Sequence, residues 1–268
     1  MQLDTQLGMQ LDTQLGTQLG TQLGLAPDQI ILIFAGALAG GLVNGLTGFG
    51  TALTALGIWL FAMPPSVAST LVIFSSVASQ LQTLRMIWRT ILWKRVVVFV
   101  VPGILGVPIG TWLLPHIDPR LFKIGIGVLL LGYSAYALAR RADIKVVWGG
   151  AFADGVIGLL GGVLGGLAGI SGAPPVIWTD IRGWTKDQRR GVLQMFNTAI
   201  LSFALVLHAV AGMVTRQVIV AAIVALPGTI AGVSIGAFVY RRLADHSYQR
   251  IIMVLLMISG ALLIWSSR

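Results

Sequence analysis

One sequence feature constrains the fold more than any other: a glycine-rich interruption occurs twice, each time inside a long apolar stretch. The first copy, Asn44–Thr51, reads NGLTGFGT, and the second, Gly165–Pro175, reads GGLAGISGAPP. A shift of 121 residues aligns Gly48 of the first copy with Gly169 of the second. Glycine costs about 1 kcal/mol in a helix relative to alanine, so each copy predicts a helix break.

The composition indicates where such breaks would lie. Of the 268 residues, 56% are hydrophobic and only 10% are charged, which is typical of an all-α polytopic membrane protein. Cysteine is absent, which excludes disulfides and thiolate metal sites, and the three histidines have no metal-site spacing. We therefore expect no metal and no cofactor.

Broken backbone inside a bilayer survives only where protein or a wet cavity satisfies its polar groups. Two breaks at matching positions of two halves are the sequence pattern that indicates a transporter's binding site. Glycines also allow membrane helices to pack closely, which is the alternative explanation.

The repeat divides the chain into three parts. Residues 1–26 form a repetitive low-complexity tail, residues 27–142 a first membrane repeat and residues 143–268 a second. Each repeat is predicted to begin with a glycine-broken hairpin of two short helices, at 30–63 and at 146–178. Three transmembrane helices should follow each hairpin, at 67–84, 96–114 and 121–139 and then at 191–213, 217–239 and 248–265.

The basic residues give the orientation, because they concentrate on the cytoplasmic side of membrane proteins. If each hairpin returns to the side from which it started, all of the 18 basic residues lie inside except Arg120, Lys123, Arg216 and Arg268. Both termini are then extracytoplasmic and the two repeats are inverted. The net charge of +9 thus reflects topology and anionic lipids, and nucleic-acid binding is not expected.

The two breaks, with the order of helices around them, resemble the TauE/SafE family over about residues 27–266. The resemblance implies a permease in a prokaryotic inner membrane that moves sulfite, organosulfonates or related sulfur anions. It also implies a carrier driven by an ion gradient or by the membrane potential. The absence of an ATP-binding G-x-x-x-x-G-K-[ST] motif agrees with this.

An anion suits the breaks, because a helix that begins inside the membrane presents free N–H groups and a partial positive charge. Nearby glycines, hydroxyls and amides would complete the site, although some hydroxyls should bond only their own helix backbone. The candidate binding residues are Asn44, Thr47, Gly48, Gly50, Thr51, Ser75, Ser76, Gly169, Ser171, Gly172, Gln194, Asn197 and Thr198.

Two ionisable residues fall within apolar stretches, where charged groups are usually functional. Asp154 is either a carrier of a coupling proton or a structural residue bonded to a neighbouring helix. His208 is expected near the membrane interface. The expected partners are a small anion, a coupling proton or cation, lipids and a second copy in a homodimer.

Two other functions compete with the carrier. Gly169–Gly172 matches the G-x-S-G of rhomboid-type proteases, with Ser171 as nucleophile and His208 as base. The equivalent of Ser171 in the first copy is Gly50, so a protease leaves the first copy unexplained. A passive anion channel could share broken helices with a carrier.

Overall fold

The computed structural model describes residues 25–87, 92–139, 148–184, 186–240, and also 257, 260, 261, 264 and 265. Within these residues the chain is helical and contains no strand. In the described part of the chain, six helices are long and apolar enough to cross a membrane. The predicted tail up to residue 24, most of the predicted span 248–265 and the basic groups at 140–145 and 241–250 lie outside the described residues.

Among the described residues, the first half contains six helices, which are α2 (Pro27–Thr47), α3 (Thr51–Trp59), α4 (Pro65–Ile87), α5 (Trp93–Leu113), the 3-10 helix η2 (Leu114–His116) and α6 (Pro119–Ala139). The second half contains α7 (Gly150–Ala168), α8 (Ala173–Ile181), α9 (Lys186–Val210) and α10 (Arg216–Tyr240). The spans predicted at 67–84 and 96–114 are found as α4 and α5, and those at 191–213 and 217–239 as α9 and α10. The span predicted at 121–139 is found as the helix α6, which is not among the six candidate membrane spans.

The limbs of the two hairpins are unequal, whereas two short limbs were predicted. α2 has 21 residues and α7 has 19, but α3 and α8 have nine each. The helix α2 continues through Gly36 and Gly40, because residues of α3 pack closely against these two glycines. A Cβ atom on Gly36 would lie 2.8 Å from Trp59 Cδ1, and one on Gly40 would lie 3.0 Å from Ala55 Cβ. These glycines serve close packing, and the break comes only at Gly48–Gly50.

Each hairpin returns to the level at which it began. Gln29 Nε2, in the first turn of α2, donates a hydrogen bond to Ala62 O after the end of α3 at 3.3 Å. Arg182 Nη1, after α8, donates to Trp148 O before α7 at 3.4 Å. The orientation predicted from the basic residues requires each hairpin to return in this way.

Close glycine contacts fix the relative direction of the outer helix pairs. Along α2 and α10, a Cβ on Gly41 would lie 3.1 Å from Val233 N, and one on Gly45 would lie 2.8 Å from Ala237 N, so the two helices run in the same direction. α5 and α7 also run together, as shown by the pairs Gly106–Val163 and Gly110–Leu167.

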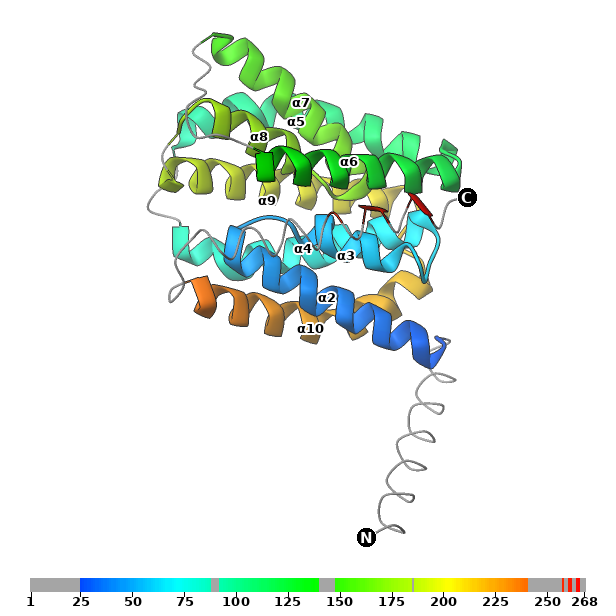
Figure 1. The fold of residues 1–268 in the computed structure, drawn as a ribbon. Coiled ribbons are helices and arrows are strands. Elements are labelled where there is room, and N and C mark those ends of the chain that lie inside the picture. The colour runs from blue at the N-terminus through cyan, green and yellow to red at the C-terminus, as the bar shows by residue number, and fades with distance from the viewer. Residues whose placement is uncertain are drawn as a thin grey trace, which may run out of the picture.

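The central helices α4 and α9 run in opposite directions, because the start of one meets the end of the other: Thr70 contacts His208, and Thr83 contacts Gln194. Figure 1 shows this pair between α2–α10 and α5–α7. α4 runs with α10, since Gln82 lies beside Ser234 and Thr70 shares an apolar cavity with Val218.

Candidate functional site

The two breaks are built from backbone conformations that favour glycine. α2 ends at Thr47, and Gly48 and Gly50 then adopt φ values of 80° and 103° before α3 begins. In the second copy Gly169 has a φ of 69° directly after α7. A side chain is disfavoured at such φ values by about 1–2 kcal/mol, which explains why the chain stops its helices at these positions.

A small cavity of about 20 Å³ lies between the two breaks. It is lined from both halves by backbone and side chains of α2, α3, α4, α8, α9 and the break loops. Eight of the residues proposed from the sequence line it, namely Asn44, Gly50, Thr51, Ser76, Gly169, Ser171, Gly172 and Asn197. The cavity therefore joins the two halves of the chain at one site.

Polar side chains in the cavity are tied to one another within each half. Ser171 Oγ donates to Asn197 Oδ1 at 2.8 Å, in the second half. In the first half Asn44 Nδ2 donates to Thr51 Oγ1 at 2.9 Å. Each pair links a break to a long helix and holds one amide at the cavity wall.

Three buried oxygen atoms of cavity-lining residues have no hydrogen-bond partner within the described part of the chain: Asn44 Oδ1, Ser76 Oγ and Gln80 Oε1. Buried polar groups are nearly always paired in folded proteins, and an unpaired one costs about 1–3 kcal/mol. Unpaired oxygen atoms also occur away from the cavity, for example at Thr54 and Thr229, so the three show that the cavity wall is polar and do not by themselves identify a ligand.

Two short helices begin at the cavity. The first residues of α3 are Thr51, Ala52 and Leu53, all of which line it, and Ala173 at the start of α8 does so too. Backbone N–H groups in a first turn have no partner within their own helix, and they carry the positive end of the helix dipole. Among the first three residues of α8 only Ala173 supplies such a group, because Pro174 and Pro175 have no N–H. No ionisable side chain is among the described residues that line the cavity.

Five proposed binding residues do not line the cavity. Thr47 and Thr198 donate to backbone carbonyls of their own helices, as expected for some of the hydroxyls. Gln194 donates to Thr83 on α4, and Ser75 is buried nearby. Gly48 lies at the edge, where a Cβ atom would be 3.5 Å from Arg190 Nε.

The structure adds Gln80, which was not proposed from the sequence. Its Nε2 donates to Gly48 O at 3.4 Å, so it fixes the first break from α4. The polar character of α4 was the available signal. It did not single out Gln80, because Ser69, Ser79 and Thr83 on the same helix are also buried.

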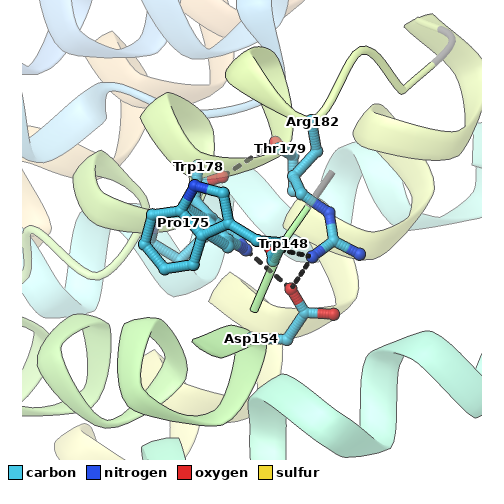
Figure 2. Close-up of polar contacts among 6 residues, drawn as sticks. All are labelled: Trp148, Asp154, Pro175, Trp178, Thr179 and Arg182. Carbon is cyan, nitrogen blue, oxygen red and sulfur yellow. Dashed lines mark hydrogen bonds and ion pairs between the residues drawn. The ribbon is translucent and has the colours of Figure 1, made fainter. Parts of the chain in front are cut away.

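Asp154 lies outside the cavity, at the base of the second hairpin. Figure 2 shows its carboxylate between Trp178 and Arg182. Trp178 Nε1 donates to Asp154 Oδ1 at 2.6 Å, and Arg182 Nη1 forms an ion pair with the same oxygen at 3.7 Å. These contacts join the start of α7 to the end of α8, which matches the structural alternative for this residue.

The protease pair is not assembled. Ser171 Oγ donates to Asn197, whereas His208 lies between Thr70 Oγ1 and Gly166 O. His208 is fully buried on α9, two residues before the end of that helix. Its position near the membrane interface stays a prediction. A serine nucleophile needs its base within hydrogen-bond reach, and His208 already has partners at both ring nitrogens.

A bundle of long apolar helices with paired breaks defines a multi-pass membrane protein. The family model described as sulfite exporter TauE/SafE matches residues 32–263, and the chain belongs to this family. Its members are membrane transporters of sulfite and other sulfur anions. No match was found among the curated proteins or the solved structures that were compared with the chain.

Proposed function

We propose that the protein is a secondary transporter that binds a small sulfur oxyanion, such as sulfite or an organosulfonate, in the cavity between the two breaks. The observation that carries this proposal is the convergence of two helix N-termini and several amides and hydroxyls on one buried site that joins both halves. Neutral donors bind an anion without an arginine or lysine when helix N-termini supply partial positive charge.

The amides must present N–H groups to an anion. Asn197 accepts from Ser171 through Oδ1, which leaves its Nδ2 for the cavity. Turning the Asn44 amide over gives the equivalent arrangement, with Thr51 as donor and the Asn44 N–H₂ group directed at the ligand. Oxygen and nitrogen of an amide are assigned from the hydrogen-bond network, and this orientation also gives Asn44 Oδ1 a partner.

The helix directions support transport by inverted repeats. α2, α4 and α10 run one way, and α5, α7 and α9 run the other, so equivalent helices of the two halves point in opposite directions. Inverted repeats let one fixed site open alternately to the two sides as the halves rock. Residues 27–142 and 143–268 are the repeats in this proposal.

The driving force depends on the direction of transport. One unit charge that crosses 100 mV is worth about 2.3 kcal/mol. An inside-negative potential is therefore sufficient to export a monoanion, whereas uptake of the same anion requires a co-transported cation or proton.

A ligand screen tests the binding site. The thermal unfolding midpoint of the purified protein is measured with sulfite, sulfate, methanesulfonate and acetate, each against chloride at equal ionic strength. We expect the sulfur oxyanions to raise the midpoint above the chloride control. If none of them does so, the proposal is wrong.

Single cysteines test the orientation, because the chain has no native cysteine to confuse labelling. Leu92 and His116 are partly or fully exposed at opposite ends of α5. Cysteine at position 92 should react with a membrane-impermeant reagent from the cytoplasm, and cysteine at position 116 from outside. Labelling of both from one side would contradict the topology.

A further inference from the structure

His208, on the helix that also carries Asn197, is a buried ionisable residue to which the proposed binding site gives no role. Its side chain is fully buried and bridges three helices: Nδ1 lies 2.9 Å from Thr70 Oγ1 on α4, and Nε2 lies 2.7 Å from Gly166 O on α7. The imidazole therefore connects the first half of the chain to the second. It does so directly behind the second break.

The contact between His208 Nε2 and Gly166 O shows that Nε2 is a hydrogen-bond donor. Gly166 lies in the last turn of α7, where the break removes the usual backbone partners of the carbonyl groups. A carbonyl oxygen only accepts, so Nε2 carries a hydrogen. His208 thus satisfies a carbonyl that is left open where α7 ends at the break.

The Nδ1 contact has two possible hydrogen arrangements. Thr70 Oγ1 lies 2.9 Å from Nδ1 and also 2.8 Å from Ser66 O, but a threonine hydroxyl has one hydrogen. With neutral imidazole, Thr70 donates to Nδ1 and gives up Ser66. With imidazolium, Nδ1 donates to Thr70, and Thr70 donates to Ser66 O. All three contacts are satisfied together only in the protonated form.

We propose that His208 is the proton-binding site coupled to anion transport, an inference that rests on the proposed function above. A buried imidazolium is costly without a counter-charge. An anion in the cavity supplies one about 10 Å away, since Leu201 on the same helix lines the cavity and lies seven residues before His208. The proton and the anion therefore raise each other's affinity.

No other charge competes for this role within the described residues. Among the described residues at this end of the bundle, the other charged or ionisable side chains are exposed, apart from Lys123, which is half-buried. None forms a hydrogen bond with the imidazole: Asp28, His116, Asp118, Arg120, Lys123 and Arg216. At the opposite end, α7 carries Asp154, and α9 carries Arg189 and Arg190. The bound anion is thus the counter-charge for the imidazolium.

Calorimetric titration tests the proposal by counting protons. Methanesulfonate keeps one negative charge throughout pH 5.5–8, so protons taken up on binding enter the protein. Titrations of the wild type in two buffers of different ionisation enthalpy should show fractional proton uptake near neutral pH. The affinity should rise, by up to about tenfold per pH unit, as the pH falls. His208→Gln should bind methanesulfonate with no uptake and little pH dependence.

His116→Gln is the matched control, because His116 is exposed and bonds only Trp112 O. It should behave as the wild type does. Equal proton uptake by His208→Gln and the wild type would overturn the proposal while leaving the anion site intact. Absence of any binding heat from methanesulfonate and sulfite in the wild type would instead overturn the proposed function.

A second variant tests the proposal if His208→Gln does not fold. Thr70→Val keeps the imidazole and removes the oxygen that accepts from Nδ1 in the protonated form. It should reduce the proton uptake on methanesulfonate binding below that of the wild type. Unchanged uptake in Thr70→Val would contradict the role given to this contact.

Discussion

The first hairpin fastens its limbs with a neutral bond, from Trp59 Nε1 to Ile33 O at 3.1 Å, whereas the second uses Trp178, Asp154 and Arg182. The acceptor positions correspond, because a shift of 121 residues places Ile33 on Asp154, whereas Trp59 and Trp178 are 119 residues apart. Both hairpins are therefore held by an indole N–H, with a backbone acceptor in one and a carboxylate in the other. A carboxylate at this place is one solution to a structural requirement that the other hairpin meets without charge.

The tips of the two hairpins, where the breaks lie, differ as well. The first tip has room beside Gly48, since the nearest atom to a Cβ on this glycine would be Arg190 Nε at 3.5 Å, although a Cβ on Gly50 would lie 2.9 Å from Val43 Cγ1. The second tip is tight, with Val72 Cγ1 at 2.7 Å from a Cβ on Gly169. The hairpins thus share a left-handed glycine directly after the long helix and differ in how closely the surroundings pack against it.

The largest expected effect comes from charge in the cavity. Asn44→Asp and Asn197→Asp each place a carboxylate on the wall of the proposed anion site, from opposite halves. Two like charges about 5 Å apart repel by about 3 kcal/mol at an effective dielectric constant of 20. Each variant should weaken sulfite binding at least about a hundredfold.

Gln188→Glu makes the same charge change on α9, outside the cavity, and is the control. Calorimetry or a thermal-shift titration measures all three variants. Loss of binding in only one of the two cavity variants would mean that a single hairpin, and not the pair, forms the site.

The next effect distinguishes the two tips. Gly48→Ala should cost about 1–2 kcal/mol, because only the left-handed backbone disfavours a side chain. Gly169→Ala adds overpacking against Val72, which costs about 1–3 kcal/mol more. Denaturant unfolding in detergent measures the difference, and Gly132→Ala, with open space around it, is the control. Equal losses at the two tips would contradict the packing difference.

A smaller effect separates the two indole bonds. Hydrogen bonds to charged groups contribute about 1.5–3 kcal/mol and neutral ones about 1 kcal/mol. Trp178→Phe should therefore destabilise the protein by about 1 kcal/mol more than Trp59→Phe. Trp112→Phe, at a ring that is 65% exposed, controls for the substitution itself. The reverse order would show that packing, and not the acceptor's charge, decides the stability of the hairpin bases.

The sequence predicted the breaks and the five described helices that follow the hairpins because glycine clusters and apolar lengths are local signals. It did not separate glycines that break a helix from those that pack one, because Gly40 and Gly48 differ only in the neighbours that the fold brings. Nor could it identify Gln80, since α4 is polar on several sides. The partners of His208 come from Thr70 and Gly166, far away in the chain.

The smallest expected effect is that of Asp154→Asn. Asparagine still accepts the indole N–H of Trp178 and loses only the ion pair with Arg182, which at 3.7 Å and partial exposure contributes at most about 1 kcal/mol. If Asp154 carried the coupling proton, the substitution would impair uptake driven by a pH gradient and spare efflux driven by the membrane potential. Asp154 contacts Trp178 and Arg182 and lies outside the cavity. We therefore expect that the substitution leaves the rate of each transport mode close to that of the wild type. Proteoliposomes in which potential and pH gradient are imposed separately measure the two rates. Selective loss of the pH-driven mode would transfer the coupling role from His208 to Asp154.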